Sequence, residues 1–185
     1  NHSLPFLNKE DINMAHSINI ATAKALKDKF GEGYKGVLYG GFISTATGVK
    51  LIEYNARFGD PEAMNVLSLL DSCFIDICNG IVDGNLSRVD VQFRAKATVC
   101  KYAVPKGYPD KPIRGVPIET SDVQNPEQLF YASVDVKNGQ LILAGSRAVA
   151  AVGIADNISS AEEIAEKNIS AIKGPVFHRT DIGTN

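Results

Sequence analysis

The sequence lacks the features that mark several classes of protein. Its 19 lysine and arginine residues are outnumbered by 21 acidic residues, which gives a net charge of -2. Nucleic acids and anionic membranes attract basic surfaces, so this balance argues against either as a partner. The chain contains no apolar run of about 18 residues, the length that suggests a membrane-spanning helix, and no charged-then-apolar leader. A cytoplasmic location is therefore expected.

Cysteine is scarce as well, with only Cys73, Cys78 and Cys100 in 185 residues. No Cys-x-x-Cys pair is present, and on a helix Cys73 and Cys78 would point about 140 degrees apart. The sequence therefore predicts neither a zinc site nor a disulfide framework.

The rest of the composition, 44% hydrophobic and 22% charged residues, is that of an ordinary globular protein. Apolar residues recur at helical spacing over residues 9–30, and Asn8 with Asp11 resembles a capping box, so a long helix is predicted. Two strands are predicted over residues 37–44 and 49–54, joined by a glycine-containing turn. Two short helices are predicted over residues 61–70 and 72–82. Asp71 is expected to cap the helix that begins at residue 72.

A change of character near residue 92 predicts a domain boundary. Ser159 and Glu162 form the pattern of another capping box, so a helix is expected from there to Gly174. The fold class is α+β, in two parts that cover residues 1–92 and 93–185. Strands of the second part are predicted over residues 97–104, 129–136, 140–143 and 147–154, with an Asn-Gly turn between the second and third.

The stretch Gly31–Gly36 matches the Gly-x-Gly-x-x-Gly pattern of dinucleotide-binding proteins. That pattern needs a strand before it and a helix after it, whereas here a predicted helix precedes it and a predicted strand follows. We therefore interpret the stretch as a helix end and a turn, and reject a nucleotide site there.

The residues best suited to binding or catalysis lie in the run from Leu51 to Glu62. If residues 49–55 are a strand, Glu53 and Asn55 project to the same face and offer a carboxylate beside an amide oxygen. Hard oxygen donors suit magnesium, which leaves its other positions to water and substrate phosphates. A solvated strand end is the alternative interpretation of the same pair.

The residues that follow extend this candidate site. Arg57 lies on the same side if the extended run continues, and its planar fork suits phosphate or carboxylate oxygens. The chain then turns at Gly59, and Asp60 is expected to cap a helix whose first residue is Pro61. Glu62 falls in the first turn of that helix, where negative charge is favourable.

The run from Glu53 to Glu62, Glu-Tyr-Asn-Ala-Arg-Phe-Gly-Asp-Pro-Glu, resembles the metal-binding signature of the ATP-grasp ligases, and within them the phosphoribosylamine-glycine ligase family. The resemblance extends to the preceding hairpin, residues 36–52, and to the closing residues 177–183, so it covers nearly the whole chain. Members of this family are much longer, and the chain begins with Asn1 rather than Met. We therefore expect a C-terminal piece of a longer enzyme.

The resemblance implies that residues 1–92 are the C-terminal half of an ATP-grasp domain and residues 93–185 a small, mostly β C-terminal domain with one helix. It implies a reaction that joins glycine to 5-phosphoribosylamine through a glycyl phosphate, with ATP and Mg²⁺ (or Mn²⁺) as cofactors. The amine-substrate domain and most of the adenine-binding half would belong to the missing N-terminal part. The piece by itself is expected to be inactive.

The resemblance also implies roles for individual residues. Glu53 and Asn55 would hold the metal. Arg57 would contact the cofactor and stabilise either the transferring phosphoryl group or the glycyl carboxylate, as a catalytic residue. Asp60 would be the second catalytic residue, orienting its loop or the amine nucleophile.

Further substrate contacts are implied at Pro61, Glu62 and Arg147. For Arg147, in the Gly145–Arg147 turn, the expected role is contact with the substrate phosphate, and a structural turn is the alternative. Arg179 and Asp181 form either a closing ion pair or substrate contacts.

Other functions also stay open. The purine-pathway carboxylases and biotin carboxylase share the superfamily and activate bicarbonate instead of glycine. A stand-alone nucleotide-binding or interaction module is the non-enzyme alternative, and the intact Glu53 and Asn55 pair argues against it.

Overall fold

The computed structural model describes residue 4 and residues 7–184, and it divides into two compact units. Unit 1 comprises residues 1–66 and 70–93, and unit 2 comprises residues 67–69 and 94–185. Both units contain helices and strands, so the predicted α+β class is confirmed. Among the described residues, no helix has both the length and the apolar character needed to cross a membrane.

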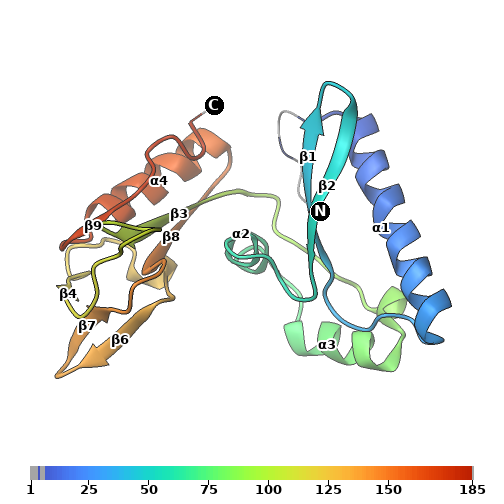
Figure 1. The fold of residues 1–185 in the computed structure, drawn as a ribbon, viewed down its shortest axis with the longest axis horizontal. Helices are drawn as coiled ribbons and strands as arrows, with labels where there is room; N and C mark the ends of the chain where they lie inside the picture. Colours follow the sequence, from blue (N-terminus) through green and yellow to red (C-terminus); the bar gives the residue numbers. More distant parts are fainter. Residues whose placement is uncertain (1–3, 5–6, 185) are drawn as a thin grey trace. The chain divides into compact units, whose positions relative to one another are not determined.

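Unit 1 contains a long helix, a two-stranded hairpin and shorter helices (Figure 1). Its elements are α1 (Lys9–Phe30), β1 (Tyr39–Thr45), β2 (Gly48–Asn55), α2 (Glu62–Leu67), α3 (Phe74–Asp83) and the 3-10 turn η1 (Leu86–Arg88). Figure 1 shows α1 running beside the hairpin, and the two are in contact.

The helix predicted over residues 9–30 is confirmed together with both of its ends. The Asn8 side chain accepts a hydrogen bond from the Asp11 N–H at 2.8 Å, and the Asn8 N–H donates to the Asp11 carboxylate at 3.5 Å. This capping box satisfies two backbone donors at the helix start. At the other end Gly31 has a φ of 81° and donates its N–H to the Lys27 carbonyl, so the helix stops there.

A β-bulge in the hairpin decides which side chains share a face. Pairing is regular from the turn up to Leu51 and then shifts by one residue. After the shift, Gly41 pairs with Glu53 and Tyr39 pairs with Asn55. Because side chains alternate between the faces of a strand, both pairs lie on one face.

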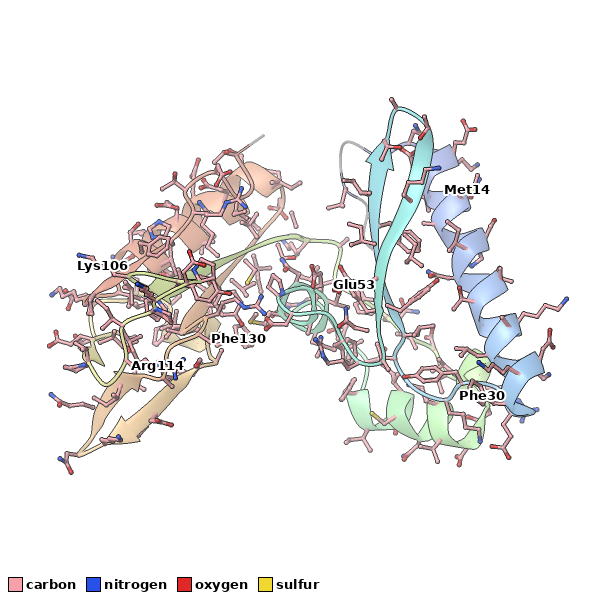
Figure 2. The ribbon with its side chains drawn as sticks, viewed as in Figure 1. Met14, Phe30, Glu53, Lys106, Arg114 and Phe130 are labelled. Atoms are coloured by element: carbon pink, nitrogen blue, oxygen red, sulfur yellow. The ribbon has the colours of Figure 1, made fainter. Side chains whose placement is uncertain are left out.

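Tyr54 fixes the other face of β2 to α1. Its hydroxyl donates to Asn19 Oδ1 at 2.8 Å. Its partner on β1, Gly40, leaves room for this contact, because a Cβ there would come within 3.0 Å of the same oxygen. The neighbours of Tyr54, Glu53 and Asn55, therefore project away from α1, and Figure 2 shows Glu53 on that side of the hairpin.

The predicted start of α2 is wrong by one residue. Pro61 is not the first helical residue, because it lies in a turn and α2 begins at Glu62; the Asp60–Pro61 peptide bond is cis. The Ala63 N–H donates to the Gly59 carbonyl at 2.9 Å, so the turn leads directly into the helix.

The predicted cap of α3 is also wrong. The Asp71 N–H donates to the Gln92 carbonyl at 3.0 Å, which ties this residue to the segment that follows the helix. Cys73 occupies the N-cap position, without a side-chain hydrogen bond. The end of the helix is as predicted, at Gly84 with a φ of 70°.

Unit 2 consists of two antiparallel sheets and one α-helix. Its elements are β3 (Ala97–Pro105), β4 (Pro117–Ile118), η2 (Pro126–Gln128), β5 (Leu129–Tyr131), β6 (Val134–Lys137), β7 (Gln140–Leu143), β8 (Val149–Ala155), α4 (Ile158–Ser170) and β9 (Val176–Phe177). One sheet has the order β5-β8-β3-β9 and the other the order β4-β7-β6. Figure 1 shows α4 along the four-stranded sheet, in contact with β3 and β8.

The helix α4 packs closely on β8. A Cβ on Gly153 of β8 would collide with the carbonyl oxygen of Ala161 in α4, so only glycine permits this approach. Ala161 and Ala165 on the facing side of α4 are fully buried. The larger buried side chains of the core include Ile118, Leu129, Leu143, Val149 and Ile169.

The strand predicted over residues 129–136 is two strands in different sheets. β5 pairs with β8, whereas β6 pairs with β7. Ser133, between them, donates its N–H to the Arg147 carbonyl at 2.9 Å and accepts from the Ala144 N–H at 3.1 Å. These two bonds hold the chain where it passes from one sheet to the other.

The turns and caps of unit 2 agree with the sequence in part. Asn138 and Gly139 form the predicted turn between β6 and β7, with φ of 51° and 77°. The cap of α4 differs from the prediction, because the Asn157 side chain accepts from the Ser160 N–H at 2.9 Å. Asn157 is therefore the N-cap, in place of Ser159.

A buried lysine ties the end of the chain to this unit. The Lys101 side chain is inaccessible to solvent and donates to Glu162 at 2.6 Å, to Glu166 at 2.5 Å and to the Thr180 carbonyl at 3.0 Å. His178 lies 2.9 Å from the Glu166 carboxylate. Burial would raise the pKa of Glu166, but the hydrogen bonds with Lys101 and His178 outweigh it and lower this pKa to about 2.

Candidate functional site

The candidate metal pair lies at the end of β2 in unit 1. Asn55 Nδ2 donates to Glu53 Oε1 at 3.0 Å, so the two side chains occupy the common face that strand alternation predicts. Glu53 is exposed and Asn55 is half-buried. The pair is therefore accessible to a ligand, and its carboxylate is not sequestered by a cation of the protein within the described residues.

The donor atoms of this pair fit a hard divalent cation. A carboxylate and an amide both present oxygen, which Mg²⁺ and Mn²⁺ accept. Within the part of the chain that the structure describes, no three His, Cys, Asp or Glu side chains converge. A cation on Glu53 and Asn55 would thus take its remaining ligands from water or from substrate phosphates, as Mg²⁺ commonly does.

Tyr39 and Glu62 border the pair, and sequence reasoning missed Tyr39. The Tyr39 ring and the Glu62 carboxylate meet over Gly59, because a Cβ there would lie 2.5 Å from Glu62 Oε2 and 3.1 Å from two ring carbons of Tyr39. Burial, the charge and hydrogen bond of Glu62, and the charge of Glu53 together raise the pKa of Tyr39 to about 12. Without the bulge, Tyr39 would pair with Tyr54 instead of Asn55, so simple hairpin counting does not find this contact.

Arg57 is not an extension of the strand, and this expectation is wrong. β2 ends at Asn55, and residues 56 and 57 form a bend. The Arg57 guanidinium donates to the Phe58 carbonyl at 2.6 Å, while the Phe58 ring packs on Phe74 with centroids 6.1 Å apart. The ring contact anchors the loop, and the exposed guanidinium is turned toward its own backbone.

The last three residues of the signature occupy the turn into α2. Asp60 is exposed, whereas Pro61 and Glu62 are half-buried. Among these three, Glu62 approaches the ring of Tyr39 over Gly59, and Tyr39 pairs with Asn55 of the candidate metal pair.

Arg147 lies in unit 2, just before β8. Its guanidinium sits over the Tyr102 ring, with Cζ 5.2 Å from the ring centroid, which is a cation–π contact. Sequence reasoning missed a second arginine at the same turn, Arg114, which is labelled in Figure 2. A Cβ on Gly145 would collide with the Arg114 side chain, and the φ of 99° at this position also favours glycine.

Arg179 and Asp181 form an exposed ion pair. Arg179 Nε donates to one carboxylate oxygen at 2.9 Å and its terminal nitrogen to the other at 2.5 Å. Of the two predicted alternatives, the structure shows the ion pair, whose exposure limits its contribution to stability.

Comparison with known proteins finds two domains of one family in this chain. Residues 2–63 match the phosphoribosylglycinamide synthetase ATP-grasp (A) domain, and residues 98–185 match the phosphoribosylglycinamide synthetase C domain. The chain belongs to the phosphoribosylglycinamide synthetase family. The family predicted from the Glu53–Glu62 signature is therefore confirmed.

Relatives in the synthetase family align with nearly the whole chain. The phosphoribosylamine–glycine ligase of Methanocaldococcus jannaschii is 55% identical over 185 residues, which cover 98% of the chain and 41% of the relative. The ligase of the same name from Methanobrevibacter smithii is 51% identical, over 98% of the chain and 42% of the relative. The chain thus spans less than half the length of the curated relatives it matches.

The synthetase fold is also found in a solved structure. The crystal structure of phosphoribosylamine–glycine ligase from Thermotoga maritima matches with a TM-score of 0.74 and 23% sequence identity. The match covers 97% of the chain and 44% of that protein. This likeness supports the fold.

Proposed function

We propose that the chain is the C-terminal part of an ATP-dependent ligase that joins glycine to 5-phosphoribosylamine in purine biosynthesis. The observation that carries the proposal is the Glu53–Asn55 pair, which ends β2 within the region matched by the ATP-grasp domain of the family. Residues 1–92 would be the C-terminal half of that domain, and residues 93–185 the C domain. A cytoplasmic location belongs to the same proposal.

In the proposed reaction, a carboxylate oxygen of glycine attacks the terminal phosphorus of ATP, so glycyl phosphate forms and ADP leaves. The amine of phosphoribosylamine then attacks the glycyl carbonyl carbon. A carbon–nitrogen bond forms, the amine loses a proton, and phosphate leaves as the second product. Neither step changes an oxidation state, so no redox cofactor is required.

Glu53 and Asn55 are the residues that would hold Mg²⁺ or Mn²⁺. When bound, such a cation neutralises the charge that develops on the ATP phosphates. Glu53 would matter more than Asn55, because it supplies a full negative charge where the amide supplies a dipole.

The loop after the pair would serve the substrates. Arg57 is exposed, so its guanidinium can leave the Phe58 carbonyl for the transferring phosphoryl group or the glycyl carboxylate. Asp60 would orient the loop or the amine nucleophile. Pro61 and Glu62 would complete the substrate contacts at the start of α2.

The first experiment compares Glu53→Gln with Glu32→Gln in the complete enzyme that contains this chain. Both changes remove one exposed carboxylate of unit 1, but only Glu53 belongs to the pair. Phosphate release that requires both glycine and phosphoribosylamine should fall by about a hundredfold or more for Glu53→Gln and stay unchanged for Glu32→Gln. Near-normal turnover of a folded Glu53→Gln enzyme would remove Glu53 from the site, and release driven by bicarbonate instead of glycine would change the substrate.

Arg147 is the proposed contact of the sugar phosphate. Arg147→Ala should raise the KM for phosphoribosylamine about tenfold, which corresponds to one charge-assisted hydrogen bond, with little change in the KM for ATP or glycine. Tyr102→Leu is a control that removes the ring beneath the guanidinium and keeps the charge. Equal increases for all three substrates would assign Arg147 a structural role in the turn.

A further inference from the structure

The turn between β7 and β8, residues 144–148, is held at both ends and open in the middle. The N–H groups of Ala144 and Ala148 donate to backbone carbonyls of unit 2 at 3.1 Å and 3.0 Å. Between them, the N–H groups of Gly145 and Ser146 donate no hydrogen bond within the part of the chain that the structure describes. Successive N–H groups of this kind in a turn line concave anion sites in proteins.

The Arg114 side chain lies across this turn. A Cβ on Gly145 would come within 2.7 Å of the Arg114 Cγ and 2.8 Å of its Cδ, and would collide with its Nε. The segment of Arg114 is fixed beside the turn, because the Gly115 N–H donates to the Leu143 carbonyl at 2.8 Å. Arg114 is exposed (Figure 2), and its guanidinium has no hydrogen-bond acceptor or carboxylate partner among the described residues.

Arg147, near the end of the same turn, supplies a second guanidinium. Its Cζ lies 5.2 Å from the centroid of the Tyr102 ring. The neighbour of Tyr102 on β3, Lys101, reaches Glu162 and Glu166 of α4. Because successive side chains of a strand project to opposite faces, Tyr102 points away from α4. The helix therefore does not cover the Arg147 guanidinium.

We infer that Arg114 is a specificity-determining residue of the proposed ligase: with Arg147 and the N–H groups of Gly145 and Ser146, it binds the phosphate of phosphoribosylamine. The inference rests on the proposed function. A phosphate monoester carries about 1.5 to 2 negative charges at neutral pH and presents three acceptor oxygens. One guanidinium in bidentate contact engages two of them, so a second guanidinium and the turn donors have an oxygen left to bind. Arg114 thus favours the phosphorylated amine over an unphosphorylated one.

The test compares Arg114→Met with Arg114→Lys in the complete enzyme that contains this chain. Methionine keeps an unbranched stem over Gly145 without the charge, whereas lysine keeps the charge without the planar fork. The probes are ribose 5-phosphate, which has the sugar phosphate and no amine, and ribose, which lacks the phosphate. Calorimetric titration measures the affinity for each.

The native enzyme should bind ribose 5-phosphate at least about tenfold more tightly than ribose, because only the former carries the charge that the arginines recognise. Arg114→Met should weaken ribose 5-phosphate binding about tenfold, the scale of one charge-assisted hydrogen bond, and Arg114→Lys should weaken it less. Affinity for ribose should not change. A native affinity for ribose 5-phosphate that Arg114→Met leaves intact would overturn the inference, and Arg114→Lys decides if the methionine variant does not fold.

Lys111→Met is the matched control. Lys111 is another exposed cation of the segment between β3 and β4, and its side chain does not lie over Gly145. Its removal should leave the affinity for ribose 5-phosphate within about twofold of the native value, because an exposed charge away from the ligand is screened. A loss as large as that of Arg114→Met would mean that the ligand senses only the positive charge of the segment, and would overturn the direct contact.

Turnover separates this inference from the proposed function. If the native enzyme releases no phosphate with glycine and phosphoribosylamine, the proposed function fails, while ribose 5-phosphate binding that depends on Arg114 still supports the sugar-phosphate site. If turnover is normal and Arg114→Met leaves the KM for phosphoribosylamine unchanged, the function stands and the inference is overturned.

Discussion

Unit 2 has a core of buried apolar side chains, and the described residues of unit 1 have none. The buried hydrophobic side chains of the described chain all lie in unit 2, where Val149, Ala151 and Ala161 have no exposure. In unit 1, no α1 residue is buried, and apolar side chains such as Ile20 and Ile52 are 56% and 66% exposed. Helical periodicity thus identifies an amphipathic helix without showing what covers its apolar face.

The two units also differ in whether their polar groups are buried or accessible to solvent. In unit 2, Lys101 is enclosed by its carboxylate partners and serves the packing of the chain end. In unit 1, Glu53 and Asn55 stand on a hairpin with accessible side chains. Under the proposed function, a further part of the ATP-grasp domain would cover the exposed face of unit 1.

Hydrogen exchange should show the largest difference between the units. In the 185-residue chain, amides of β3 and β8 should exchange only through unfolding of unit 2, which costs about 5 kcal/mol or more. Amides of α1 and the hairpin should exchange through openings that cost far less. NMR-detected exchange measures both in one sample, with α4 as an internal standard for unit 2. Equal protection would mean that unit 1 is stable without further chain.

Lys101→Ala tests the enclosed network of unit 2. It leaves Glu162 and Glu166 without their shared cation, and removal of one partner of a buried pair costs about 4 kcal/mol. Lys96→Ala is the control, because the Lys96–Asp156 pair in the same unit is exposed, at 43% and 83%, and its loss should cost a small fraction of that. Urea unfolding gives both values. Similar losses would show that Lys101 is not held as the structure indicates.

Gly153→Ala tests the packing of α4 on β8. The added methyl group meets the Ala161 carbonyl oxygen, so the helix must move, and we expect a loss of about 3 kcal/mol in the unfolding free energy of unit 2. Gly33→Ala is the matched change in unit 1, where nothing lies within 4 Å of the added carbon. Thermal unfolding followed by circular dichroism compares the two. A tolerated Gly153→Ala would refute the close approach.

The smallest expected effect is on the pH dependence of the stability of unit 2. The pKa of Glu166 is about 2 in the folded chain and about 4.3 in an unfolded one. The folded state therefore binds fewer protons, and the stability from this group is complete above about pH 5 and is lost as the pH falls toward 2. Glu166→Gln should flatten the stability curve in this window. Ser159→Ala, an exposed change on the same helix, should leave its slope unchanged. An unchanged slope for Glu166→Gln would refute the low pKa.

The sequence predicts the local elements well and the long-range ones poorly. The capped helix over residues 9–30, the Asn138–Gly139 turn and the common face of Glu53 and Asn55 agree with the structure. Each depends on residues within a few positions of one another. The strand over residues 129–136 was predicted whole, because its alternation is continuous, but the two halves pair with different partners.

The surroundings of Tyr39 and Lys101 depend on long-range contacts. Tyr39 lies on the face of Glu53 and Asn55 because a bulge shifts the pairing of β1 with β2 by one residue, and a one-residue shift moves every later side chain to the other face. Lys101 is enclosed by hydrogen-bond partners that lie 61, 65 and 79 positions away in the sequence. Local sequence patterns are enough to predict the capped helix, the turn, the spacing of Glu53 and Asn55, and the family signature. The register of the hairpin and the enclosure of a charge depend on contacts that form only when distant parts of the chain meet, so local patterns do not encode them.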